Sequence, residues 1–334
     1  MTKLVVGGVV LLATVALAEV PESTSAGTPL FRRDVSAIQM LVNNGFKAGA
    51  VNADGLVVIT PSSDPLEAIG AAAAEWSGVG SARIGFLPAQ QTSLSNDPSD
   101  GNFVLTIQDT PENRSIVGSY LAITVYQYSA DGTITDSDVI FNPSVVQSGV
   151  LYPFSTDGEI GSYDLQSLVA HELGHSLGSS HSPVISATMF QAQTPFATYI
   201  VAAAATVHRV LSADDIAFAT TRYPAAGAQV GSISGGVVFM SGSPVLGALV
   251  VALDPTTGIT IGGLSSLSDG TYRLSSVPPG SYFVYAQPAN GPVTAANMAG
   301  VPNMSQANVN FRVTFAGGNA TPSAIPVTTP SIEA

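Results

Sequence analysis

Three of the four histidines in the chain lie close together, in the stretch HELGHSLGSSH that runs from His171 to His181. His171 and His175 are four positions apart, so on a helix their imidazoles share one face and lie about 6 Å apart along the axis. Gly178 comes three residues after His175, where a residue with positive φ can end the helix and turn the chain back. His181 can then reach the same cation. Three neutral nitrogens, with a fourth position left for water, suit a catalytic Zn²⁺.

Glu172 is the residue that separates chemistry from metal binding alone. A carboxylate beside the metal can take a proton from the bound water, whose pKa zinc lowers to about 7, and can later pass it to a leaving amine. The sequence therefore predicts one catalytic zinc ion held by the three histidines, with Glu172 as general base of a peptide hydrolase. The alternatives are a solvated polar face with incidental spacing and a zinc site that has lost its activity.

The same stretch satisfies H-E-x-x-H-x-x-G-x-x-H, and on these residues the chain resembles the metzincin metallopeptidases. Met189, in the sequence SATMF eight residues after His181, stands where the family has its Met-turn, and we expect it to support the site from below. The serine directly after the third histidine, Ser182, makes the chain resemble the matrixin branch of the family. The resemblance implies an α+β zincin domain with a mixed twisted sheet, an active-site helix and a C-terminal helix.

Two features depart from the matrixin pattern. Phe190, Gln191, Ala192 and Gln193 occupy the place of the Pro-x-Tyr element that lines the specificity pocket in matrixins, so no cleavage preference is carried over. The chain also contains no cysteine, which excludes the cysteine-switch propeptide of the family. Any latency must therefore work in another way.

Matrixin-like enzymes commonly carry structural Ca²⁺, whose usual ligands are carboxylate and carbonyl oxygens. Acidic residues flank the expected active-site helix and are candidates for such a site: Asp131, Asp136, Asp138, Asp157 and Glu159. Their spacing matches no defined calcium loop. Solvated loop acids are the alternative.

The histidines require a helix, and residues 162–177 predict one. Ser162 can cap it, and Asp164 falls in its positive first turn. Its apolar residues recur every four positions and form one stripe, which points away from the histidines: Leu165, Val169, Leu173 and Leu177. We therefore expect one face to pack on a sheet and the opposite face to hold the metal.

The remaining elements before residue 225 predict a single mixed sheet. A helix is expected after the N-cap Asp64, with Pro65 at its first position, Glu67 at the third and a stop near Gly78. A second helix is expected at 211–223. Strands are expected from the apolar alternation at 36–43, 56–60, 82–87, 102–109, 121–129 and 137–142. This order of strands and helices is that of an α+β domain.

Residues 232–334 show another pattern, with short alternating strands separated by Gly, Pro and Asp turns. The elements GSISG (231–235), PVLGA (244–248), DGTY (269–272) and PPGSY (278–282) resemble the carboxypeptidase regulatory-like, transthyretin-type domain. The resemblance implies an all-β sandwich with an accessory role in stability, anchoring or substrate holding. Each of these four elements is a turn followed by a strand, and none of them offers a catalytic group.

The N-terminus predicts export. Lys3, the apolar run over residues 4–18 and the small residues before Glu19 have the pattern of a signal peptide over 1–18, and the run is too short to span a bilayer. We therefore expect a protein that is secreted or associated with the cell surface, without a transmembrane helix once the signal is removed. Residues 19–30 are expected to be flexible, 31–225 to form the peptidase domain and 226–231 to be a linker.

Composition limits the partners. Charged residues make up 10% of the chain, and the net charge of −13 argues against nucleic acid. A monomer that binds a peptide or protein substrate, laid along an edge strand, is the expectation. One rival is another zincin branch, whose third ligand is an acid from a later helix. The other is an exported binding or adhesion protein with a catalytically inert zincin domain.

Overall fold

The structure is a computed structural model of the 334-residue chain and describes residues 20–328, apart from residues 148, 194, 197–207 and 299–300. The signal peptide expected at 1–18 lies outside the described residues. None of the helices in the described part is both long enough and apolar enough to cross a membrane.

The N-terminal half is built on a five-stranded sheet in the order β2-β1-β3-β5-β4. The strands are β1 (Met40–Asn43), β2 (Gln90–Thr92), β3 (Phe103–Thr106), β4 (Ala122–Tyr128) and β5 (Ile134–Phe141). β4 runs antiparallel to β5, and the other neighbours are parallel. The sheet therefore ends on one side in the antiparallel strand β4.

Two of the predicted strands do not form. Residues 56–60 and 82–87 make only isolated bridges, such as Ile59 to Phe154 and Ile38 to Phe86. Each stretch runs directly into a proline, Pro61 or Pro88, which has no N–H to donate to a ladder. Apolar alternation alone did not reveal this interruption.

Two helices and the sheet enclose the main core. α1 (Pro65–Ser77) begins as predicted, since the Asp64 side chain accepts a hydrogen bond from the Glu67 N–H at 3.0 Å, and it ends at Gly78. α1 packs on α3 (Leu165–Ser176), and the fully buried Trp76 donates its indole N–H to the Ala170 carbonyl at 2.8 Å. A short helix that the sequence had not suggested, α2 (Pro111–Val117), is capped by Thr110.

The start of α3 differs from the prediction. Asp164, not Ser162, is the N-cap: its carboxylate accepts from the Ser167 N–H at 2.7 Å and pairs with Arg209. The Ser162 hydroxyl instead bonds that of Ser155 at 2.6 Å, so it is not free to cap. The apolar stripe is buried as expected, but the histidine face is also buried, because further chain covers it.

Residues 20–30, which the sequence led us to expect as a flexible terminus, make backbone hydrogen bonds to the loop that follows α3. The Val20 carbonyl accepts from the Ser180 N–H at 2.7 Å, and the Glu22 N–H donates to the Gly178 carbonyl at 2.9 Å. Leu30 is buried. The polar composition of this segment did not reveal that its backbone groups pair with the loop that follows α3.

The C-terminal half consists of two sheets that share one core. β10 (Gly231–Gly236) pairs with β13 (Thr271–Val277), and the second sheet has the order β12-β11-β14-β15, with β16 beside β14. Ile233 and Leu274 from the first sheet pack with Val250 and Val284 from the second. The strands of the second sheet are β11 (Leu249–Leu253), β12 (Thr260–Leu264), β14 (Gly280–Gln287), β15 (Thr314–Phe315) and β16 (Ala324–Val327).

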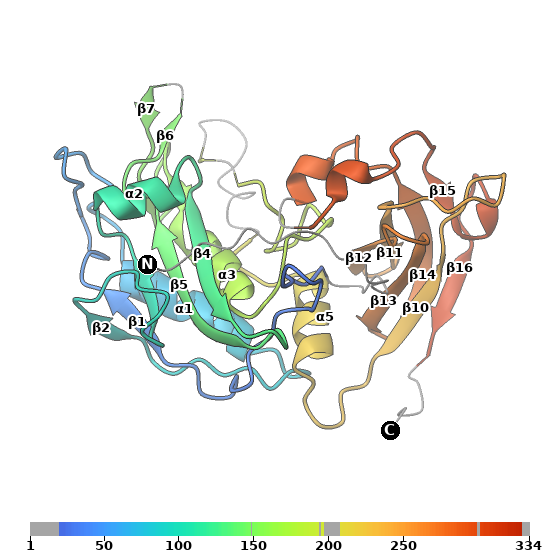
Figure 1. Cartoon of the computed structure of the whole chain (residues 1–334), viewed down its shortest axis with the longest axis horizontal. Helices are drawn as coiled ribbons and strands as arrows, with labels where there is room; N and C mark the ends of the chain where they lie inside the picture. Colours follow the sequence, from blue (N-terminus) through green and yellow to red (C-terminus); the bar gives the residue numbers. More distant parts are fainter. Residues whose placement is uncertain (1–19, 148, 194, 197–207, 299–300, 329–334) are drawn as a thin grey trace.

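One helix stands between the two halves. α5 (Ala213–Arg222) starts at the N-cap Ser212 and has the N-terminal sheet on its left and the C-terminal strands on its right in Figure 1. Phe218 and Ala219 pack into the core of the first half, whereas Ala217 packs into that of the second. The helix therefore belongs to both cores.

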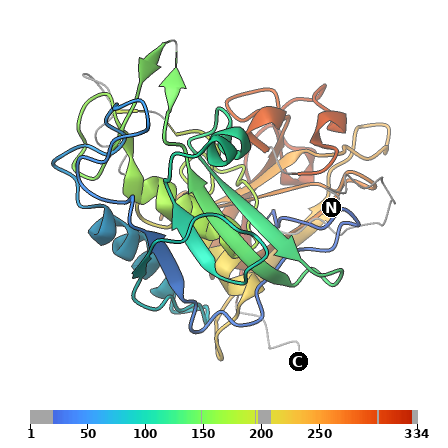
Figure 2. The ribbon, with the colours of Figure 1, turned by 60° about the vertical axis from the view of Figure 1, so that its left-hand side comes forward.

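Short elements complete the chain. The hairpin of β6 (Val146–Gln147) and β7 (Val150–Leu151) projects from the N-terminal half in both Figure 1 and Figure 2. β8 (Phe154–Ser155) pairs with β9 (Tyr163–Asp164) just before α3. The 3-10 helices are η1 (Ala295–Met298), η2 (Met304–Gln306) and η3 (Ala316–Gly318).

Candidate metal centre

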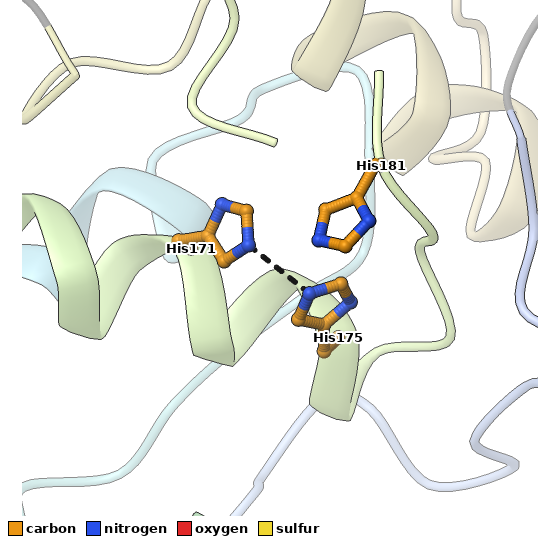
Figure 3. Close-up of side chains that lie close together, drawn as sticks. All are labelled: His171, His175 and His181. Atoms are coloured by element: carbon orange, nitrogen blue, oxygen red, sulfur yellow. Dashed lines mark hydrogen bonds between the residues drawn. The ribbon is translucent and has the colours of Figure 1, made fainter. Parts of the chain in front are cut away.

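The three predicted histidines come together. His171 and His175 project from α3, and His181 reaches them from the loop that follows (Figure 3). One ring nitrogen of each lies within 4.8 Å of the others, and the Nε2 atoms of His171 and His175 are 3.1 Å apart. Two nitrogens bound tetrahedrally to zinc at about 2.0 to 2.1 Å would be separated by roughly 3.3 Å. The spacing of the first two histidines thus fits a shared ion.

Gly178 makes the return of the loop possible. Its φ is 90°, as the sequence predicted for the residue that ends the helix. A Cβ at this position would lie 2.5 Å from the Leu30 carbonyl oxygen, so the N-terminal segment packs directly against the bare backbone. Both the backbone conformation and the close approach exclude a side chain here.

Backbone carbonyls fix the tautomers of two histidines. The Nδ1 of His171 is 2.8 Å from the Thr188 carbonyl oxygen, and the Nδ1 of His175 is 2.7 Å from that of Ser179. A carbonyl only accepts, so each Nδ1 carries the proton and each Nε2 carries a lone pair. The two lone pairs therefore face each other across the 3.1 Å gap.

A cation placed between the two nitrogens would satisfy both of these lone pairs. A proton is a poor candidate, because burial and the neighbouring imidazoles lower the pKa of His171 well below its usual value and that of His175 to about 3. A metal ion satisfies both nitrogens at once. The donor set of neutral imidazoles suits Zn²⁺, which the residues present therefore fit.

Glu172 lies beside this cluster, and only 4% of its surface is exposed. Its Oε2 accepts a hydrogen bond from the Thr124 hydroxyl at 2.6 Å. Burial raises the pKa of Glu172 to about 7, and the bond from Thr124 opposes that rise. A carboxylate with a pKa near neutrality is suited to accept and return a proton. Thr124 itself carried no signal in the sequence beyond its place in a predicted strand.

The cluster opens into a cavity of about 520 Å³. The edge strand β4 forms one wall with Ala122, Ile123, Thr124 and Tyr126, and the three histidines and Glu172 are also among the lining residues. Gln191 and Gln193, from the stretch that departs from the matrixin pattern, line it too. The Glu22 carboxylate of the N-terminal segment contributes another acid, whose pKa burial raises to about 7.

Met189 packs against α3 at Gly174, between the two histidines of that helix. It is 1% exposed, and its Sδ occupies space that leaves no room at Gly174, where a Cβ would meet that sulfur at 2.2 Å. The same Cβ would meet the Trp76 ring at 2.9 Å. Gly174 is thus required by close packing, a role that its position between the two histidines did not reveal.

A second carboxylate fixes the turn around Met189. Asp215, 1% exposed at the start of α5, accepts from the backbone N–H of Thr188 at 2.8 Å and of Met189 at 3.0 Å. Thr188 in turn presents its carbonyl to His171. This acid at the start of α5 therefore orients a histidine indirectly, a role that the sequence did not reveal.

The five acids considered for calcium do not come together. Asp136 and Asp138 are buried on β5 and accept backbone N–H groups of Gly101 and Val104, whereas Asp131 forms an exposed pair with Arg33. Asp157 and Glu159 are exposed in the loop before α3. Among the described residues, the three histidines are the only group of three or more such side chains close enough to hold a metal.

The chain matches no protein-family model and no curated protein at significant similarity. Its function must therefore be argued from the site.

Proposed function

We propose that the protein is a zinc-dependent metalloendopeptidase and that residues 31–225 form a matrixin-like metzincin domain. The observation that carries the proposal is the pair of Nε2 lone pairs of His171 and His175, which face each other at 3.1 Å beside the buried carboxylate of Glu172. His181 supplies the third nitrogen. Incidental spacing on a polar surface would not explain why backbone carbonyls accept from Nδ1 of both His171 and His175.

The residues of the chain divide the work of hydrolysis. His171, His175 and His181 would hold the zinc, which supplies a Lewis acid for the substrate carbonyl and lowers the pKa of water. Glu172 accepts a proton at its carboxylate and returns it to the departing amine. The Thr124 hydroxyl, 2.6 Å from Oε2, keeps that carboxylate oriented toward the cavity. Burial of these groups strengthens each electrostatic contact, because little water competes for it.

An extended peptide is the substrate that the cavity accommodates. β4 is the last strand of its sheet and lines the cavity, so its outer edge can pair with a peptide backbone by β-augmentation. Gln191 and Gln193 line the same cavity. Side-chain selection would therefore depend on residues other than the Pro-x-Tyr element of matrixins.

The test uses the purified mature chain with one equivalent of zinc, assayed on denatured casein and on a peptide library. Glu172→Gln is the matched control, because it keeps shape and burial but cannot act as a base. Hydrolysis by the parent, its loss with a chelator and its loss in Glu172→Gln are the expected results. Equal activity in both proteins would contradict the role of Glu172, and no activity in either would favour the inert binding protein.

The proposal includes export and an accessory C-terminal domain of the carboxypeptidase regulatory-like type. Its support is the signal-like sequence at 1–18 and the turn motifs at 231–282. N-terminal sequencing of protein recovered from the culture medium would test the first part, with a start at Glu19 as the expected result. A start at Met1, or retention inside the cell, would contradict it.

A further inference from the structure

The loop that carries the third histidine is held from both halves of the molecule. It runs from His181 to Phe190, and its second residue, Ser182, is 5% exposed. The Ser182 hydroxyl donates to Oδ2 of Asp214 on α5, at 2.5 Å. The other carboxylate oxygen of Asp214 accepts from the Gly262 N–H at 2.7 Å. A single buried carboxylate therefore joins the loop to β12 of the C-terminal half.

β12 also touches the loop directly. A Cβ at Gly262 would lie 2.7 Å from Cγ2 of Val184 and 2.8 Å from Cγ of Pro183. Glycine is thus the only residue that lets this strand approach the two residues that follow Ser182. The contact is a packed one, and a single methyl group would force the loop or the strand to move.

The end of the loop is anchored in the same way. Phe190, the residue after Met189, is buried in a cluster with Leu249 and Leu264 of the C-terminal sheet. The loop that holds His181 at one end and Met189 near the other is therefore wedged between α5 and the C-terminal strands. In Figure 1 α5 stands at the same junction.

We infer that the C-terminal half is a working part of the metal centre, in which Asp214 and Gly262 act as positioning residues for His181. This inference rests on the proposed zinc site. The sequence left the role of the C-terminal domain open between stability, anchoring and substrate holding. The contacts assign it a fourth role: it fixes the loop from which the third ligand projects, so the ligand is already in place when the metal arrives.

Gly262→Ala in the full chain tests the inference. The added methyl should displace residues 183–184 and weaken zinc affinity by roughly 10- to 100-fold, the range seen when the partners of metal ligands are altered. Zinc affinity is measured by competition with a chromogenic chelator, alongside kcat, KM and the midpoint of thermal unfolding. At saturating zinc, kcat should fall more than KM rises, because β4 is untouched.

Two control variants separate this effect from general weakening of the C-terminal half. Gly236→Ala adds a methyl on β10, where nothing lies within 4 Å. Ser276→Ala removes the 2.7 Å hydrogen bond from Thr221, which crosses the same junction at the far end of α5. Both should bind zinc as the parent does, even if Ser276→Ala melts at a lower temperature.

The outcomes are distinguishable. If Gly262→Ala binds zinc within twofold of Gly236→Ala, the inference is wrong, although the proposed function stands. If the parent itself binds no zinc, the proposed function fails first. Should Gly262→Ala not fold, Ser182→Ala replaces it, since it removes the hydroxyl that donates to Asp214 and leaves the bond between Asp214 and Gly262 in place. Unchanged zinc affinity in that variant would equally overturn the inference.

Discussion

Thr124→Val is a sharp perturbation of the proposed base, because it removes one hydroxyl and keeps the shape of the side chain. The bond that is lost joins the Thr124 hydroxyl to Oε2 of Glu172 at 2.6 Å, between two buried residues. A hydrogen bond to a charged group contributes about 1.5 to 3 kcal/mol. At 1.36 kcal/mol for each factor of ten, its loss corresponds to a decrease of roughly 10- to 150-fold in kcat/KM.

The pH dependence has a definite sign. The Thr124 bond stabilises the ionised carboxylate, so its removal raises the pKa of Glu172 further above its present value of about 7. The acid side of the pH profile of kcat/KM should therefore move to higher pH, by about one to two units. The deficit should be largest at and below neutral pH and should shrink in alkaline solution.

Thr124→Ser is the matched control, since it keeps a hydroxyl at the same place and should retain most of the activity. Zinc content is measured in both variants, so that loss of metal is not mistaken for loss of the base. If Thr124→Val and Thr124→Ser have the same kcat/KM across the pH range at equal zinc content, the role given to this bond is refuted.

Three further predictions concern the parts that position the site. Gly178→Ala should destabilise the protein by about 2 kcal/mol or more, because φ at this position is 90° and the new Cβ would lie 2.5 Å from the Leu30 carbonyl oxygen. An unchanged midpoint of thermal unfolding would contradict this. Arg209→Met should cost about 3 kcal/mol in chemical denaturation, since it leaves the 2% exposed Asp164 cap without its cation. The control is Arg33→Met, whose pair with Asp131 is exposed and whose loss should go undetected. Gly174→Val should displace Met189 and Trp76 and lower both stability and zinc affinity. Gly70→Val on α1, where nothing lies within 4 Å, should leave zinc affinity intact. Equal zinc affinity in the two variants would refute the packing role of Gly174.

The sequence predicted those features of the site that depend on local spacing. His171, His175 and Gly178 follow from the period of a helix and the conformational freedom of glycine, and the structure has the arrangement that this spacing predicts. The start of α1 at Asp64 was equally local, since its cap lies three residues from its partner.

The features that the sequence missed depend on distant contacts. Thr124 bonds to Glu172 and Asp214 bonds to Gly262, and the two residues of each pair are 48 positions apart in the sequence. Asp164 displaced Ser162 as the cap of α3, with Arg209, far along the chain, as its ion-pair partner. Nothing in the local pattern distinguishes such residues from ordinary strand or turn positions, because their roles arise only when segments far apart in the sequence pack together.

The strands expected at 56–60 and 82–87 do not form. Their apolar alternation is real, but a strand also needs a neighbour to which it can donate and from which it can accept along its length. Pro61 and Pro88 interrupt that exchange, and only isolated bridges remain. A proline directly after a short apolar run therefore argues against a full strand.

The proposed function depends on one zinc ion bound by His171, His175 and His181. Metal analysis combined with X-ray absorption at the zinc edge, on the parent and on His181→Ala, measures this binding. We expect one zinc per parent chain with three imidazole nitrogens at about 2.0 to 2.1 Å, and an affinity lowered by at least about tenfold in His181→Ala. Unchanged zinc affinity without His181, or a parent that binds no zinc, would contradict this.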